Sequence, residues 1–244
     1  KIDGLIKKAD VCINLVGILF EKGANSFTNI HEKFPSMISS LCHKHKINKF
    51  IHLSALGIEK AKESKYAISK LNGERAVQKN FKESIILKPS IIYSVDDNFT
   101  TMIMGLLNML PIFPLYYGGR TKFMPLHCVD MCDLIIDLIE NNNSDKIIEC
   151  IGPEELSFKQ IIEKLLKLIE KKRFFLPMPL FIANTFATFF EILPNPLITK
   201  DQIKLLFYDN IPSGKYKTNI DIGKNFNRYF DKEVEKYCYM WKET

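Results

Sequence analysis

Short apolar runs alternate along the first half of the chain with segments whose apolar residues have helical spacing. Residues 10–17 and 49–54 are nearly continuous apolar runs that end in small residues, Gly17 and Ser54. Residues 84–90 form a third such run. Continuous apolar runs of this length are typical of strands buried on both faces, as in a parallel sheet.

The segments between these runs have the periodicity of amphipathic helices. Residues 64–80 form one of them, and residues 26–44 form the other, with its apolar side made by Phe27, Ile30, Phe34, Ile38 and Leu41. The order is strand, helix, strand, helix, strand. This order predicts an α/β fold with a doubly wound parallel sheet and crossover helices.

The pattern is less regular after residue 97. Helical spacing predicts helices over residues 99–110, 130–141, 158–171 and 201–209, and a short strand over 146–151. Ser157 and Gln160 form a capping box before the third of these helices, and Asp130 is predicted to cap the second. Beyond residue 211 the chain is polar and turn-rich, and no element is predicted there.

Residues 174–194 are the most apolar stretch of the chain. Pro177, Pro179 and Glu191 interrupt it, so we interpret it as a packed or interfacial helix and not as a membrane span. A helix that lies on a membrane surface is the alternative. We therefore expect a soluble protein without a transmembrane helix.

Length and composition suit one large domain with an appendage. The chain has 244 residues, of which 46% are hydrophobic and 25% charged, so a sizeable core is possible. The element pattern predicts an α/β domain over residues 1–150 and a small, mostly helical region over residues 151–244.

Charge and cysteine content exclude two classes of function. The net charge is +6, but nearly all the cations are scattered lysines, whereas nucleic-acid binding relies on clustered charge and on arginine. We therefore expect no nucleic-acid partner. No two of the six cysteines have the spacing of a zinc or redox motif, so no metal site and no disulfide framework are predicted. We therefore expect the protein to reside in a reducing compartment.

Tyr66 and Lys70 are four residues apart on a predicted helix and so share one face. In a carbonyl reductase, a tyrosine in this position transfers the proton on the substrate oxygen, and the lysine lowers the tyrosine pKa and holds the ribose of a nicotinamide cofactor. Lysine is so frequent here that one such pair is expected by chance. The alternative is a packed Tyr66 and a solvated Lys70.

The positions of other residues strengthen the functional interpretation. Ser54 ends a predicted strand, and ligands of open α/β sheets bind outside the carboxyl ends of the strands. We therefore predict a catalytic set made by Ser54, Tyr66 and Lys70. The predicted cofactor-binding set consists of Asn14, Val16, Gly17, Ser54, Tyr66, Lys70, Pro89, Ser90 and Ile91.

Four segments follow one another in a characteristic order: Asn14-Leu-Val-Gly17, Ser54-Ala-Leu-Gly57, Tyr66-x-x-x-Lys70 and Lys88-Pro-Ser-Ile-Ile92. This order resembles the extended, atypical short-chain dehydrogenases, which are similar to NAD-dependent epimerases and dehydratases. Among them the chain looks most like the NAD(P)H-binding accessory subunits of respiratory complex I and their bacterial relatives. The resemblance extends into later segments, at residues 97–99, 175–179, 190–194 and 198–201.

The resemblance implies a partial NAD(P)-binding Rossmann-like domain over residues 1–150 that lacks its usual beginning. It also implies that the helical region over residues 151–244 completes the substrate and partner side. Such proteins start with a strand, a Gly-rich loop and a helix that together bind the cofactor phosphates. No G-x-G-x-x-G run occurs here. We therefore expect residues 10–17 to form an exposed apolar edge strand. The expected cofactor is NADP or NAD, with NADPH favoured, and binding is expected only in the full-length protein.

Two functions follow from the resemblance. The first is a structural or assembly subunit of respiratory NADH dehydrogenase that holds its cofactor without turnover. Its partners would be complex I subunits, with membrane-surface contact through residues 174–197, on the mitochondrial matrix side or the cytoplasmic side of a bacterial inner membrane. The second is an active NAD(P)-dependent reductase, epimerase or dehydratase that acts on a quinone precursor. The resemblance also places His127 near a substrate pocket, although a structural histidine is favoured.

Overall fold

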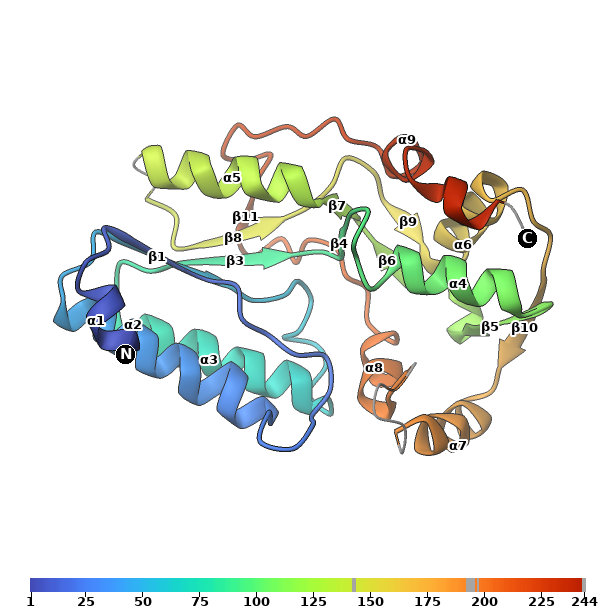
Figure 1. The fold of residues 1–244 in the computed structure, drawn as a ribbon, viewed down its shortest axis with the longest axis horizontal. Helices are drawn as coiled ribbons and strands as arrows, with labels where there is room; N and C mark the ends of the chain where they lie inside the picture. The colour runs from blue at the N-terminus through green and yellow to red at the C-terminus, as the bar shows by residue number, and fades with distance from the viewer. Residues whose placement is uncertain (142–143, 192–195, 197, 243–244) are drawn as a thin grey trace. The chain divides into compact units, whose positions relative to one another are not determined.

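The computed structural model describes the whole chain except residues 142–143, 192–195, 197 and 243–244. The chain forms two compact units (Figure 1). The first unit contains residues 1–89, 133–150 and 212–222, and the second contains residues 90–132, 151–211 and 223–244. The units do not follow a single boundary at residue 150, because residues 90–132 belong to the second unit and residues 212–222 belong to the first.

The first unit is built on a five-stranded sheet with the order β1-β2-β3-β8-β11. Its strands are β1 (Val11–Asn14), β2 (Lys49–Leu53), β3 (Ile85–Pro89), β8 (Ile147–Cys150) and β11 (Lys217–Thr218). Every neighbouring pair is parallel. The central strands β2 and β3 are buried on both faces, which accounts for their continuous apolar sequence. The predicted parallel α/β sheet is confirmed.

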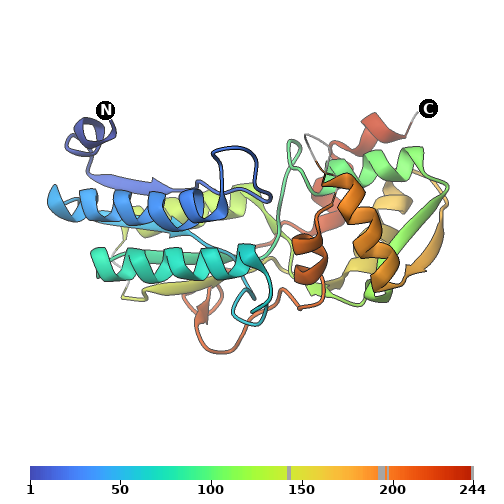
Figure 2. The ribbon, with the colours of Figure 1, turned by 90° about the horizontal axis from the view of Figure 1, so that it is seen from below.

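Helices cover both faces of this sheet. α2 (Phe34–Lys44) and α3 (Lys65–Asn80) lie on one face, and α5 (Cys128–Glu140) runs along the other (Figures 1 and 2). A short helix, α1 (Ile2–Ile6), and a π-helical segment, η1 (Thr28–Lys33), precede α2. The Lys49 ammonium donates hydrogen bonds to the last carbonyls of α5, at 3.0 Å to Leu138 and 2.6 Å to Ile139. A cation there stabilises the negative end of the helix.

Strand β1 lies at the edge of the sheet, as expected. The strand itself is shorter than the predicted run and ends at Asn14. Apolar side chains of the strand and of the segment after it are exposed, namely Ile13, Leu15, Val16 and Leu19. An apolar edge of this kind is a template for pairing with a further strand.

The second unit combines helices with three two-stranded sheets. The strand pairs are β4 (Ile92–Tyr93) with β7 (Leu126–His127), β5 (Ile112–Tyr116) with β10 (Phe174–Met178), and β6 (Lys122–Phe123) with β9 (Leu156–Ser157). The helices are α4 (Thr100–Met109), α6 (Phe158–Leu168), α7 (Leu180–Phe190), α8 (Lys200–Leu205) and α9 (Phe230–Glu235), with 3₁₀ segments at Tyr117–Gly119 and Cys238–Trp241. The predicted capping box of Ser157 and Gln160 begins α6 and is confirmed.

The apolar stretch 174–194 is not one helix, and that prediction is wrong. It forms strand β10 and then α7, separated by Pro179. β10 pairs in parallel with β5, with Phe174 opposite Ile112. Proline has no amide hydrogen for a helix interior, but it is tolerated in a short edge pairing. Residues 192–194 lie outside the described part of the chain.

Two further sequence-based predictions need correction. Asp130 does not cap α5, because the helix begins at Cys128 and the Asp130 carboxylate pairs with Arg228 instead. The region beyond residue 211 was expected to lack elements, but it contributes β11, α9 and the final 3₁₀ turn. Phe230 and Val234 of α9 are fully buried. Two apolar side chains among many polar ones give too weak a periodicity to predict this helix.

No helix in the described ranges reaches the combination of length and hydrophobicity that crossing a bilayer requires.

Candidate cofactor site at the strand ends

Helix α3 carries Tyr66 and Lys70 to the carboxyl end of β2. The Ser64 side chain caps the helix by accepting a hydrogen bond from the Ala67 amide at 3.1 Å, which fixes where the helix begins. One turn later, the Lys70 ammonium donates to the Leu53 carbonyl at 3.0 Å. Leu53 is the last residue of β2, so Lys70 lies beside the predicted Ser54 position.

Gly17 lies against the Lys70 ammonium. A β-carbon at Gly17 would be 3.4 Å from Lys70 Nζ and 3.8 Å from His31 Nε2. The absence of a side chain therefore keeps the backbone after β1 close to a buried cation. Burial lowers the pKa of Lys70 to about 8, and the nearby Glu74 carboxylate opposes this shift.

Asn14 organises the loop that leads from β1 to Gly17. Its amide nitrogen donates to His52 Nδ1 at 3.0 Å, and its amide oxygen accepts a hydrogen bond from the Val16 amide at 3.2 Å. Because His52 Nδ1 is an acceptor, the hydrogen of the neutral ring is on Nε2. Burial lowers the pKa of His52 to about 3, so the ring is neutral. Its Nε2 is buried and has no hydrogen-bond partner among the described residues.

His31, which the sequence did not single out, connects this loop to α3. Its Nε2 accepts a hydrogen bond from the Ile18 amide at 3.0 Å, and its Nδ1 donates to Ser69 Oγ at 2.9 Å. Ser69 in turn donates to the Tyr66 carbonyl at 2.8 Å. Burial lowers the pKa of His31 to about 4, and the Lys70 charge adds to the shift. The sequence did carry a signal for His31, because it lies four residues after Phe27 and three before Phe34 and so falls on the apolar side of the predicted helix.

Tyr66 packs edge-on against the rings of His31 and Phe27, with centroid distances of 5.2 and 5.9 Å. Burial raises the pKa of Tyr66 to about 12. A tyrosine that transfers protons near neutral pH requires the opposite shift.

Ser54 belongs to a buried polar cluster beneath the strand ends. Its hydroxyl donates to the Glu74 carboxylate, and Glu74 pairs with Lys88 at 2.9 Å. Lys88 also pairs with Glu59, and its ammonium lies 5.2 Å from the centre of the Tyr216 ring. Lys88 is 1% exposed. The sequence signal for this cluster was Lys88 inside an apolar predicted strand, because a buried cation requires an acidic partner.

The predicted residues after β3 are held by structural hydrogen bonds. The Pro89 carbonyl accepts from the Leu56 amide at 2.9 Å within the first unit. Ser90 and Ile91 belong to the second unit. There the Ser90 hydroxyl donates to Asn210 Oδ1 at 2.6 Å and accepts from the Met124 amide at 3.1 Å.

The residues of the first unit fit the ribose and nicotinamide half of a dinucleotide. Gly17 permits close backbone approach, Lys70 supplies an ammonium with several donors, and His52 has a buried donor without a partner. The chain contains no Gly-rich phosphate loop. In the described part of the protein, no three His, Cys, Asp or Glu side chains are placed to hold a metal ion.

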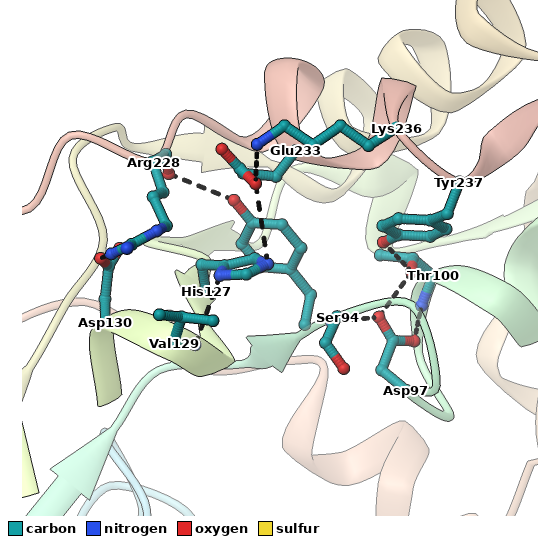
Figure 3. A network of polar contacts seen from close by, with 11 residues as sticks. Ser94, Asp97, Thr100, His127, Val129, Asp130, Arg228, Glu233, Lys236 and Tyr237 are labelled. Carbon is teal, nitrogen blue, oxygen red and sulfur yellow. Dashed lines mark hydrogen bonds and ion pairs between the residues drawn. The ribbon is translucent and has the colours of Figure 1, made fainter. Parts of the chain in front are cut away.

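His127 belongs to a separate network in the second unit (Figure 3). Its Nδ1 accepts a hydrogen bond from the Val129 amide at 3.3 Å, and its Nε2 lies 3.9 Å from a Glu233 oxygen. Its ring meets Tyr93 edge-on at 5.2 Å, and the Tyr93 hydroxyl donates to the Arg228 carbonyl at 3.2 Å. Burial lowers the pKa of His127, and Glu233 opposes this shift. These contacts give His127 a structural role in holding the C-terminal segment.

The same network continues to both sides of His127 (Figure 3). Asp130 forms an ion pair with Arg228. On the other side, Thr100 Oγ1 and the Tyr237 hydroxyl are 2.9 Å apart, and Asp97 receives hydrogen bonds from the start of α4. Residues 228–237 are thus attached to the second unit by polar contacts as well as by the buried Phe230.

No protein-family model matches the chain. Among individual proteins, the chain is 24% identical over 224 residues to the NADH-ubiquinone oxidoreductase 40 kDa subunit of Neurospora crassa, covering 91% of the chain and 59% of that protein. It is 26% identical to the NADH dehydrogenase 1 alpha subcomplex subunit 9 of Arabidopsis thaliana, covering 87% of the chain and 56% of that protein. The chain therefore spans little more than half the length of these relatives.

Solved structures with the same fold bind nicotinamide cofactors. The UDP-glucuronic acid 4-epimerase of Bacillus cereus in complex with NAD superposes with a TM-score of 0.68 at 18% identity, over 100% of the chain and 78% of the epimerase. The dTDP-glucose 4,6-dehydratase of Streptomyces venezuelae, with NAD bound, superposes with a TM-score of 0.67 at 15% identity, over 98% of the chain and 76% of the dehydratase. The chain is therefore similar in sequence to subunits of NADH dehydrogenase and has the fold of NAD-dependent epimerases and dehydratases, as the sequence motifs predicted.

Proposed function

We propose that the protein is an NAD(P)H-binding subunit of respiratory NADH dehydrogenase that stabilises the assembly and holds its cofactor without turnover. The observation that carries this proposal is the sequence relationship to complex I subunits over 91% of the chain in the Neurospora protein and 87% in the Arabidopsis protein.

The chemistry of the site supports holding a cofactor more than turning it over. Tyr66 and Lys70 would hold the ribose hydroxyls, and the Gly17 backbone would lie against the dinucleotide. Such a cofactor supplies a hydride when it acts in a reaction. Here the raised pKa of Tyr66 and the buried hydrogen bond of Ser54 both disfavour the proton transfer that must accompany that hydride. The cofactor is NAD or NADP, with NADPH favoured by the family resemblance.

An exposed apolar surface of the second unit is the proposed contact for complex I subunits or for the membrane surface. It is formed around the β5–β10 pair by Met109, Ile112, Phe174, Leu176 and Phe181. Phe174 is 80% exposed and Phe181 is 73% exposed, which is unusual for such large apolar side chains. Three of these residues, Phe174, Leu176 and Phe181, belong to the predicted contact segment 174–197. The relatives are named as mitochondrial proteins, so we propose the matrix side, with the cytoplasmic side of the membrane in a bacterial host.

An active NAD(P)-dependent reductase, epimerase or dehydratase is the second candidate, with a quinone precursor as substrate. The observation that favours it is the presence of Ser54, Tyr66 and Lys70 together at one set of strand ends. Replacing Tyr66 by phenylalanine separates the two candidates. The change removes the proton-transferring hydroxyl, so it abolishes turnover if the protein is an enzyme and leaves assembly nearly normal if it is a structural subunit.

Purification from the native membrane tests the proposal. The tagged protein is expressed in its own cells and isolated gently from solubilised membranes, and its companions are identified by mass spectrometry. Complex I subunits and a bound dinucleotide in fixed ratio are the expected result. Recovery of the protein alone from the soluble fraction would contradict the subunit function and favour the enzyme.

A further inference from the structure

The hydrogen bond between Ser54 and Glu74 has a direction that decides what Ser54 can offer a ligand. The Ser54 hydroxyl is the donor and a Glu74 carboxylate oxygen is the acceptor. Both side chains are buried, with exposures of 4% and 6%. A hydroxyl has one hydrogen to donate and two lone pairs with which to accept. When that hydrogen is directed to Glu74, Ser54 can only accept a further hydrogen bond.

Lys88 favours the ionised form of the Glu74 carboxylate. Its ammonium lies 2.9 Å from the second Glu74 oxygen and is itself almost completely buried. An ammonium can only donate, so this oxygen can only accept. Burial raises the pKa of Glu74, and the Lys88 charge acts against that shift. Protonation of Glu74 would remove one of the two carboxylates that compensate the buried Lys88 charge, which is unfavourable.

The charges of the cluster balance when both carboxylates are ionised. Lys70 and Lys88 are the cations, and Glu59 and Glu74 are the anions. Glu74 interacts with both cations, because the pKa of Lys70 also responds to its charge. The hydrogen bond from Ser54 to Glu74 is therefore charge-assisted and stronger than one between neutral groups. The Ser54 amide is fixed as well, by a hydrogen bond to the Leu87 carbonyl at 2.7 Å.

We infer that Glu74 is a positioning residue that fixes Ser54 as a hydrogen-bond acceptor, so that this site binds a ligand hydroxyl or amide N–H and does not polarise a ligand carbonyl. The inference rests on the proposed function, because it assumes that the ligand reaches the ends of β1, β2 and β3. Carbonyl reduction requires donors aimed at the oxygen on which negative charge develops. A Ser54 that cannot donate gives a physical reason for a cofactor that is held without turnover.

Neutron diffraction from crystals of the protein exchanged into D₂O tests the direction of this hydrogen bond. The expected result is a deuterium on Ser54 Oγ that points to Glu74, with no deuterium on the carboxylate. A deuterium on Glu74 that points to Ser54, with the Ser54 deuterium directed toward the strand ends, would overturn the inference. The wild-type map decides between these outcomes without any variant.

Two matched variants test whether Glu74 sets the direction. In Glu74→Gln, Lys88 donates to the amide oxygen, so the amide N–H faces Ser54 as a donor and the Ser54 hydrogen turns away. Glu59→Gln changes the other carboxylate on Lys88 and leaves the Ser54–Glu74 bond intact, so the Ser54 hydrogen stays in place. An unmoved Ser54 hydrogen in Glu74→Gln, or a moved one in Glu59→Gln, would contradict the assigned role of Glu74.

Failure of the proposed function is seen separately, as the absence of complex I subunits from the purified protein.

Discussion

The Lys70 ammonium donates a hydrogen bond to the carbonyl oxygen of Leu53 at 3.0 Å. This contact joins the middle of α3 to the last residue of β2. It also places a buried cation within 3.4 Å of the position that a side chain at Gly17 would occupy. The carboxyl ends of β1 and β2 are therefore organised around Lys70 by the chain itself, before any ligand contributes a contact.

We predict that Gly73→Ala destabilises the first unit strongly. Gly73 faces η1, and a β-carbon there would lie 1.9 Å from the His31 carbonyl oxygen. Since the contact is with backbone, the helices must move apart, at a cost of about 3 kcal/mol. Urea unfolding of the variant measures this loss.

Gly105→Ala in α4 is the matched control. A β-carbon at Gly105 has nothing within 4 Å, and alanine is favoured over glycine in a helix by about 1 kcal/mol. This control should be as stable as the wild type or slightly more stable. Equal effects of the two substitutions would show that α3 and η1 are not in close contact.

We expect acid to destabilise the protein through His31. Its pKa is about 4 in the folded protein and about 6.5 in the unfolded chain. Between these values the unfolded chain binds a proton that the folded protein does not. The free energy of unfolding therefore falls as the pH falls from about 6.5 to 4, by about 3 kcal/mol for this residue at 1.4 kcal/mol per pKa unit.

Urea unfolding at a series of pH values checks this expectation. His31→Gln removes one of two buried titrating rings and should reduce the dependence, while His52, whose pKa is also lowered by burial, keeps its share. His43 is exposed on α2, so His43→Gln serves as the control and should keep the wild-type slope. A His31→Gln variant with the full wild-type slope would assign the acid sensitivity to other groups.

We predict that the 244 residues alone bind a dinucleotide weakly. The proposed contacts to the ribose and nicotinamide half come from Tyr66, Lys70 and Gly17. The sequence has no Gly-rich loop that would bind the pyrophosphate. Titration with NADPH, followed by calorimetry, should therefore show no saturation below about 1 mM, which corresponds to about 4 kcal/mol of binding free energy. Micromolar binding would contradict this prediction and would mean that the described site is sufficient.

We predict that Phe174→Ser weakens association with complex I. Phe174 is 80% exposed on β10, so its replacement should leave the free energy of unfolding nearly unchanged while removing apolar area from the proposed contact surface. The amount of complex I recovered with the tagged variant measures the effect. Tyr239→Ser is the control, because Tyr239 is 65% exposed and lies outside this surface. Normal recovery with Phe174→Ser would exclude the β5–β10 surface as the contact.

The local sequence determined the elements of the first unit and the motif that marks the family. β2 and β3 are continuous apolar runs because both of their faces are buried, and the cap at Ser157 was predicted because capping depends on residues close in sequence. Local patterns also brought Tyr66 and Lys70 onto one helical face.

Only the tertiary structure decided the environment of those residues. His31, Glu74 and Lys88 came from separate elements, and their contacts set the direction of the Ser54 hydrogen bond and the neutral state of the histidine. Pairing with β5 likewise makes residues 174–178 a strand, β10, although the apolar pattern there predicted a helix. Burial and long-range partners fix pKa values and strand pairing, and neither is encoded in the spacing of nearby residues.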